Sequence, residues 1–239
     1  MRRRIYLPIL LAAVPGLMAL GLVTPASAAS SNGVASQSAN QIVAAAASAL
    51  TGATSFTYGG ITRSNGTSTG LKVSLSSSGN GQGTLTSSRQ PVKIIKVGDT
   101  LYVSSTKAFW TKNLGASAGN TLGTQWVAVS SGQTDYSGIA ALFQAQQISG
   151  PFLSTANTTF TKGRTGTING QPVIAVFGKS GSTVNTIYVA TTGKPYLVKI
   201  TSPGRNGGTL IFTNYNKPVN PTAPPNPITI PTSSTSTTG

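Results

Sequence analysis

The chain contains no cysteine, no histidine and no glutamate, and its acidic residues are limited to Asp99 and Asp135. Without cysteine no disulfide can stabilise the protein, so the domain needs a hydrophobic core of its own. Without histidine and cysteine, a metal site of the usual ligands cannot be assembled. Catalysis by paired carboxylates would need both aspartates in one cleft. The missing residue types therefore indicate a protein that is not an enzyme, has no catalytic residues and binds no metal or other cofactor.

One motif with a catalytic precedent is present. Ser104-Ser105-Thr106-Lys107 fits S-x-x-K, the nucleophile motif of penicillin-interacting serine enzymes. In those enzymes the serine opens a helix, and Ser-Asp-Asn and Lys-Thr-Gly elements complete the site. Here the motif follows a predicted strand and neither companion is present, so a chance match in a serine-rich chain is the simpler interpretation.

Positive charge dominates the chain, with 17 Lys and Arg residues against two acidic residues. The basic residues lie singly, as at Lys72, Lys93 and Lys107, whereas a nucleic-acid site gathers them beside exposed aromatic side chains. We therefore expect no nucleic-acid partner. Weak attraction to an anionic membrane or cell-envelope surface is the expected consequence of the net charge.

The N-terminal residues have the pattern of a secretory signal peptide. Three arginines at 2–4 precede an apolar run over 5–23, and Ala26-Ser27-Ala28 supplies the small residues of a cleavage site. Two prolines interrupt the apolar run, which argues against a retained membrane anchor. We predict that residues 1–28 are removed and that the protein is secreted, soluble and extracytoplasmic, with no cysteine for lipid anchoring.

The mature chain divides by composition into three parts. Residues 29–37 are small and polar and predict a flexible segment, and residues 218–239 are rich in Pro, Ser and Thr and predict a disordered tail. The domain is expected over 38–217. It opens with Ser38 and Gln41 in the capping-box spacing, followed by apolar residues at helical spacing and by Gly52, which predicts a helix that ends there.

From Ser55 onward, alternation at period two and glycine-rich turns predict strands. The expected strands cover residues 55–62, 69–77, 82–88, 91–97, 100–105, 108–112, 124–130, 158–168, 172–178, 183–190, 195–202 and 207–215. Gly98-Asp99 predicts a two-residue hairpin turn. Because the connections are short, the sheet should be largely antiparallel.

A helical segment over 134–153 interrupts these strands. Thr134 or Asp135 can cap it, and Ile139, Leu142 and Phe143 fall on one helical face. We expect Gly150-Pro151 to end this helix. The predicted class is α+β: a strongly curved, mostly antiparallel sheet with short helices on its concave face.

What the sheet packs against has two interpretations. In "TIYVATTGKPYLVKI" (residues 186–200), neither face of the hairpin is cleanly polar. The helices either pack on the sheet as a solid core, or the curved sheet wraps around them and leaves an elongated apolar cavity. A cavity lined without charges suits acyl chains.

The order of several motifs resembles the LppX/LprG family of actinobacterial, chiefly mycobacterial, envelope lipoproteins. The motifs are "TSFTYGG", "VKIIKVGDTLYV", "KGRTGTINGQPVIAVFG", "TIYVATTGKPYLVKI" and "FTNYNKPVNPTAP", and the resemblance covers residues 38–224. It implies a LolA-like half-barrel with a lipid-holding cavity between sheet and helices, and carriage of lipids or lipoglycans without a chemical step. Family members are typically acylated on a cysteine at the mature N-terminus, which this chain lacks.

Our expectation is a monomeric lipid carrier with a cavity between the sheet and a mobile helical side. The sheet-side candidates are Phe56, Tyr58, Leu71, Val73 and Leu75, and the helical candidates are Ile139, Leu142, Phe143, Phe152 and Leu153. The alternative is a non-catalytic cell-surface or cell-wall module with a filled core, in which the basic charge and the tail serve envelope attachment.

Overall fold

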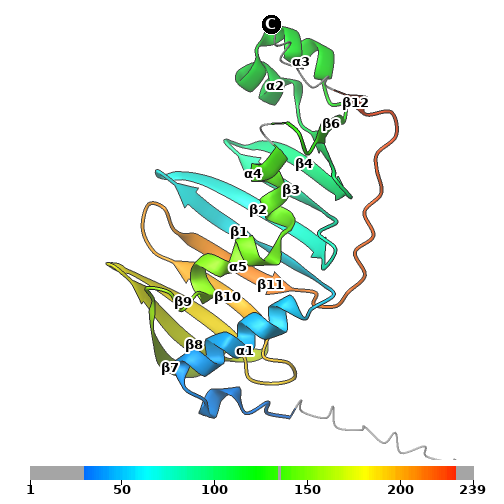
Figure 1. Ribbon diagram of the computed structural model, residues 1–239. Coiled ribbons are helices and arrows are strands. Elements are labelled where there is room, and N and C mark those ends of the chain that lie inside the picture. The colour runs from blue at the N-terminus through cyan, green and yellow to red at the C-terminus, as the bar shows by residue number, and fades with distance from the viewer. Residues whose placement is uncertain (1–29, 134–135, 230–239) are drawn as a thin grey trace, which may run out of the picture.

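The computed structural model describes residues 30–133 and 136–229, which form one curved sheet with helices inside its curve (Figure 1). The described part contains twelve strands in the spatial order β12-β6-β5-β4-β3-β2-β1-β11-β10-β9-β8-β7. Neighbouring strands are antiparallel, except that β12 lies parallel to β6. The strands are β1 (Ser55–Ser64), β2 (Thr67–Ser76), β3 (Gly81–Ser87), β4 (Gln90–Val97), β5 (Thr100–Ser104), β6 (Val127–Ser130), β7 (Thr159–Ile168), β8 (Gln171–Ser180), β9 (Thr183–Ala190), β10 (Leu197–Ser202), β11 (Gly208–Thr213) and β12 (Ile228–Thr229).

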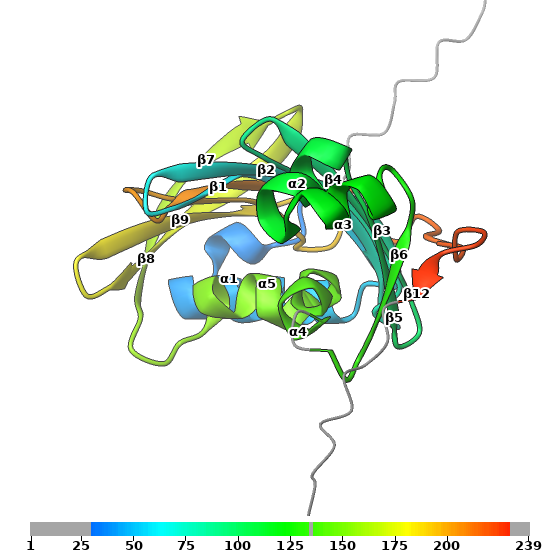
Figure 2. The same ribbon diagram turned by 90° about the horizontal axis from the view of Figure 1, so that it is seen from above.

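Two runs of hairpins build this sheet and meet at its centre, where β1 pairs with both β2 and β11. Helix α1 (Ala39–Thr51) and the helices α4 (Tyr136–Ala140), η2 (Ala141–Phe143) and α5 (Ala145–Leu153) lie inside the curve of the sheet (Figure 2). The predicted class, a curved and mostly antiparallel sheet with short helices on its concave face, is thus confirmed. Among the residues that the structure describes, no helix is long and apolar enough to span a bilayer.

Helix α1 starts at the predicted capping box. The Ser38 hydroxyl oxygen accepts from the Gln41 backbone N–H, and the Ser38 backbone N–H donates to Gln41 Oε1 at 3.0 Å. Its apolar stripe of Ile42, Val43 and Ala46 is fully buried against β8, β9 and β10. The strand prediction is also confirmed at the β4–β5 hairpin, where Val97 pairs with Thr100 across a Gly98-Asp99 turn.

The predicted strand at 108–112 is wrong, because these residues belong to helix α2 (Lys107–Leu114). The Thr106 hydroxyl caps this helix by accepting from the Phe109 N–H at 3.1 Å. Helix α3 (Ala116–Leu122) follows it, and both lie at the end of the sheet near β6 (Figure 1). The apolar Phe109-Trp110 pair suggested a strand, although the local capping chemistry starts a helix.

The helix expected over 134–153 is divided differently from the prediction. Its predicted caps, Thr134 and Asp135, lie outside the described residues. The break falls at Gln144, whose backbone is extended, between η2 and α5. Pro151 lies inside α5, which continues to Leu153, so the prediction that Gly150-Pro151 ends the helix is wrong.

The segments on either side of the expected domain also contribute to the fold. The sequence predicts flexibility over 29–37, but of these residues 30–37 pack on the domain: Ser31 bridges to Thr192, and Val34 in η1 (Val34–Ser36) is buried. After β11 the chain runs along the flank of the sheet to β12 (Figure 1). Residues 218–229 therefore follow a defined path along the sheet, whereas the sequence predicted disorder from residue 218 onward.

Candidate functional site

The concave face of the sheet carries the five sheet-side residues expected from the sequence. In β1 and β2, Phe56 pairs with Leu75 and Tyr58 pairs with Val73, so these side chains share one face. All four are buried, while Leu71, further along β2 on the same face, is half-buried. The structure thus brings the whole predicted sheet-side set together.

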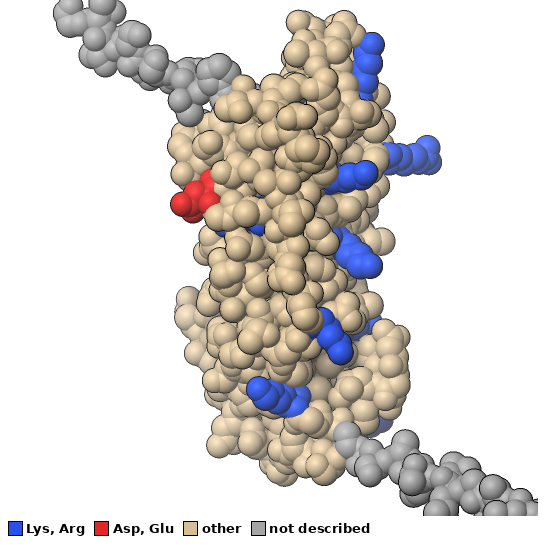
Figure 3. All heavy atoms as spheres, turned by 90° about the vertical axis from the view of Figure 1, so that its right-hand side faces the viewer, with Lys and Arg blue, Asp and Glu red and all other residues tan. Residues whose placement is uncertain are grey.

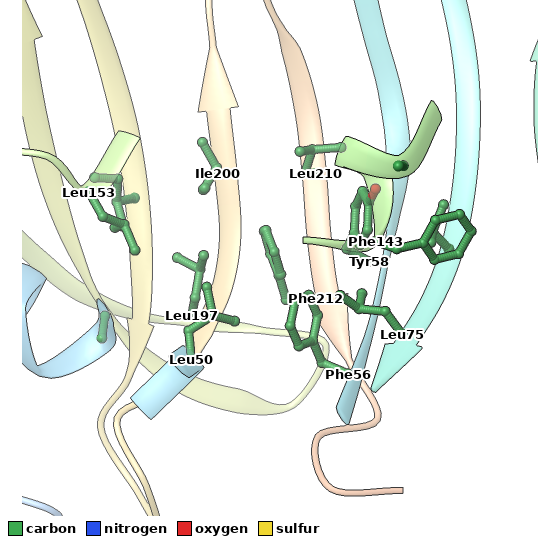
Figure 4. Close-up of a cluster of buried hydrophobic side chains, with 14 of the residues drawn as sticks. Leu50, Phe56, Tyr58, Leu75, Phe143, Leu153, Leu197, Ile200, Leu210 and Phe212 are labelled. Carbon is green, nitrogen blue, oxygen red and sulfur yellow. The ribbon is translucent and has the colours of Figure 1, made fainter. Parts of the chain in front are cut away.

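The predicted helical residues face this wall from the α4–α5 segment, which we define as residues 136–153. Phe143 and Leu153 are buried, whereas Ile139, Leu142 and Phe152 are half-buried. All five pack in or against the same hydrophobic core as the sheet residues, and Figure 4 shows Phe143 and Leu153 among them. The sheet-side and helical candidates therefore form the two sides of one apolar interface.

Phe143 is the most deeply buried of the helical candidates. Its side chain is 1% exposed and lies against Gly81 of β3, where an added Cβ would stand 2.5 Å from Phe143 Cδ1. The ring thus occupies space that glycine leaves free. In Figure 4 the Phe143 ring points away from Tyr58 and Phe212, whose own rings lie 6.1 Å apart on β1 and β11.

One hydrogen bond joins the α4–α5 segment to the sheet within the part of the chain that the structure describes. The Tyr58 hydroxyl donates to the Leu142 carbonyl oxygen at 2.8 Å. Burial raises the pKa of Tyr58 well above its ordinary value of 10.0, so the phenol keeps its proton and remains a donor. Apart from this bond, apolar contacts hold the segment on the sheet.

Two cavities lie at opposite ends of the interface. One of about 280 Å³ is lined by Leu50, Phe56, Leu75 and Phe143 together with polar residues that include Ser77, Lys96 and Gln144. The other, of about 160 Å³, is lined by Phe152, Ile200 and Leu210 together with polar residues that include Thr62 and Arg63. Phe56 and Thr62 are six residues apart on β1, so about 20 Å of strand separates the cavities. Each cavity is below the roughly 300 Å³ at which small-molecule sites begin. Between the two cavities the interface is filled by side chains.

Several residues of this interface were not among the sequence candidates. They come from α1, β10 and β11 and include Leu50, Leu197, Ile200, Leu210 and Phe212, all buried. Their alternation or helical spacing predicted a core position, but no sequence signal distinguished a cavity-facing residue from any other core residue.

The S-x-x-K residues hold the fold together at the end of β5. The Ser104 hydroxyl donates to the Thr124 carbonyl oxygen at 3.0 Å, and the Ser105 hydroxyl donates to the Pro91 carbonyl oxygen at 2.7 Å. Both serines are buried, while Lys107 is exposed at the start of α2. These contacts give each serine a structural role.

The fold belongs to the class of open, strongly bent antiparallel sheets that enclose helices in their concave side. No protein-family model matches the chain, and no curated protein matches it. Among solved structures, it is similar to LprF from Mycobacterium bovis, with 15% identity and a TM-score of 0.54 over 78% of this chain and 96% of LprF. It is also similar to the lipoprotein LppX from Mycobacterium tuberculosis, with 17% identity and a TM-score of 0.50 over 76% of this chain and 96% of LppX. These similarities confirm, at the level of the fold, the resemblance seen in the sequence.

Proposed function

We propose that the protein is a secreted, non-enzymatic lipid carrier that holds acyl chains between the concave face of the sheet and the α4–α5 segment. The single observation that carries the proposal is the pair of cavities at the two ends of this apolar interface. Side chains of the α4–α5 segment line both of them: Phe143 lines one and Phe152 the other. Displacing this segment would join the two cavities into one elongated site.

The energetics favour the replacement of buried side chains of the α4–α5 segment by a long acyl chain. Exposing a buried Phe or Leu side chain costs about 1.5–3 kcal/mol, and burying one methylene returns about 0.8 kcal/mol. Two to four methylenes therefore offset each displaced side chain. If Phe143 and Leu153 both leave the interface, a chain of about four to eight methylenes breaks even, and longer chains bind with net gain.

The position of the segment supports its role as the moving part. It is attached to the sheet by the Tyr58–Leu142 hydrogen bond and by side-chain packing, whereas each strand is held by backbone hydrogen bonds to its neighbours. The sequence resemblance to LppX/LprG proteins and the fold shared with LprF and LppX agree with the carriage of a lipid or lipoglycan.

The filled centre of the interface favours one second candidate, a non-catalytic cell-surface or cell-wall module. In that role the α4–α5 segment would stay in place, and Phe143 would be a core residue only. Residues 1–28 would direct either protein out of the cytoplasm.

Native mass spectrometry and a fluorescent fatty-acid probe distinguish the two candidates. For a carrier, we expect a co-purifying lipid that organic extraction removes, and saturable probe uptake that tightens with chain length beyond about eight methylenes. A ligand-free protein that takes up no probe of any chain length would contradict the carrier and leave the structural module.

A further inference from the structure

The pairing register places one continuous row of residues across the convex face of the sheet. In order from β4 to β8 the row contains Lys93, Thr84, Lys72, Gly59, Ile211, Lys199, Tyr188 and Ala175. Side chains alternate between the faces of a sheet. Because Val73, Ile94 and Ile200 are buried on the concave face, the lysines beside them in sequence lie on the convex face.

Three lysines of this row form a line of positive charge. Lys72 and Lys93 are two strands apart, and Lys72 and Lys199 are three strands apart, which corresponds to about 10 Å and 14 Å. Lys72 and Lys93 are exposed, and Lys199 Nζ lies 5.7 Å from the centre of the Tyr188 ring. The one acidic residue that the structure describes, Asp99, lies in the β4–β5 turn outside this row. In Figure 3 the Lys and Arg side chains follow one another along the molecule, apart from the acidic atoms.

Two grooves lie at the ends of the row, each with cations at its rim. The first, of about 460 Å³, is lined by Lys72 and Lys93 together with Ile95 and Trp126. The second, of about 690 Å³, is lined by Arg164 and Lys199 together with Ala175, Phe177 and Tyr188. Each groove thus combines positive charge with apolar lining.

Large apolar side chains are also exposed on this face. Ile61 is 48% exposed, Val184 42% and Phe177 39%. Ile61 lies two residues from Gly59, Phe177 two residues from Ala175, and Val184 four residues from Tyr188, so all three share the face of the row. Helices α1, α4 and α5 lie on the opposite, concave side of the sheet (Figure 2).

We propose that this convex face docks on the headgroup surface of an anionic lipid bilayer. The lysine row contacts the phosphates, while Phe177, Val184 and Ile61 enter the interfacial layer. Charge alone would suit a soluble anionic polymer equally well. The exposed apolar side chains among the cations favour a bilayer, because a bilayer accepts both kinds of contact. This proposal stands apart from the acyl-binding function, since the lysines and the apolar interface lie on opposite faces of the sheet.

The test compares two variants of equal net charge. The row variant is Lys72→Gln/Lys93→Gln/Lys199→Gln, and the matched control is Lys107→Gln/Lys112→Gln/Lys194→Gln, whose three lysines lie in α2 and in the β9–β10 turn. Co-sedimentation measures partitioning onto phosphatidylcholine vesicles with or without 30% phosphatidylglycerol, each at low and high salt. Uptake of the fluorescent acyl probe is measured in the same samples.

We expect the unaltered protein to bind the anionic vesicles, to bind neutral vesicles far less, and to be released by high salt. Each lysine near an anionic surface contributes about 1 kcal/mol to the binding free energy, which corresponds to about a fivefold change in affinity. The row variant should therefore bind about 100-fold more weakly, while the control variant stays within a few-fold of the unaltered protein and both take up the acyl probe normally. Equal losses in the two variants would show that net charge alone matters and would overturn the proposal. Binding to soluble heparin without binding to anionic vesicles would overturn it in favour of a polymer.

Discussion

Replacing Tyr58 with phenylalanine removes the hydrogen bond that joins the α4–α5 segment to the sheet and preserves the ring. The ring of Tyr58 lies 6.1 Å from that of Phe212 and 6.3 Å from that of Phe56, and both contacts remain available to phenylalanine. The change therefore isolates the 2.8 Å bond from the Tyr58 hydroxyl to the Leu142 carbonyl oxygen.

A buried hydrogen bond of this kind contributes about 1 kcal/mol to stability. If the α4–α5 segment must leave the sheet before an acyl chain enters, the observed affinity is the intrinsic affinity scaled by the open fraction. Destabilising the closed state by about 1 kcal/mol raises a small open fraction about fivefold. Tyr58→Phe should therefore unfold about 1 kcal/mol more easily in urea and bind the fluorescent acyl probe about fivefold more tightly.

Tyr215→Phe is the matched control. The Tyr215 hydroxyl donates to the Leu197 carbonyl oxygen at 2.7 Å, so its loss removes a similar bond that does not involve the α4–α5 segment. We expect a similar loss of stability with unchanged probe affinity. If Tyr58→Phe lost stability but left the probe affinity at the level of Tyr215→Phe, opening of this segment would not control binding and the reasoning would be refuted.

Three further predictions concern stability and filling of the interface. Phe143→Ala should lower the unfolding free energy by about 3–5 kcal/mol and tighten probe binding, because the ring no longer has to be displaced. The control Leu114→Ala, at an exposed position, should change stability by under about 0.5 kcal/mol. Weaker probe binding by the folded Phe143 variant would count against the site. Burial raises the pKa of Tyr58 and of Tyr215, and the neighbouring Tyr196 raises that of Tyr215 further. Because the two tyrosines lose their protons in the unfolded chain before they do in the folded protein, the unfolding free energy should be constant below about pH 10. Above that pH it should fall by up to about 1.4 kcal/mol per pH unit for each tyrosine. Urea unfolding between pH 8 and 11 tests this, and a double phenylalanine variant with an equally steep decline would exclude these two groups as the cause. Ser38→Ala should lower the unfolding free energy by about 1 kcal/mol, because helix α1 loses its N-terminal cap. Ser36→Ala, which lies outside the cap, should have a smaller effect. Equal losses of stability in thermal unfolding would argue against a role for the cap.

The strands were predictable from sequence because their period-two alternation matches a sheet buried on one face. The Gly98-Asp99 turn and the Ser38 cap were predictable because each depends on a few neighbouring residues. Helix α2 was not, since Phe109 and Trp110 suit a strand or a helix equally and the Thr106 cap decides between them. Pro151 was expected to end α5, but it is tolerated in the last turn of that helix.

The residues of the candidate site were predictable only in part, and the space between its two sides was not predictable at all. Alternation placed Phe56, Tyr58 and Val73 on one face, and the helical spacing directed Phe143 toward them. Whether a space remains between the two layers depends on long-range packing, such as the fit of Phe143 against Gly81. No local pattern encodes how far the helices lie from the sheet, so the sequence was compatible with both a cavity and a filled core.

Photolabelling with a long-chain fatty acid that carries a diazirine near its methyl end tests the central claim most directly, because it locates the bound chain. After irradiation, the modified residues are identified by tandem mass spectrometry. We predict adducts on both sides of the apolar interface, within residues 56–75 and 139–153, and their loss on competition with unlabelled fatty acid. Adducts confined to the convex face, or labelling that competition does not reduce, would contradict acyl binding between the sheet and the α4–α5 segment.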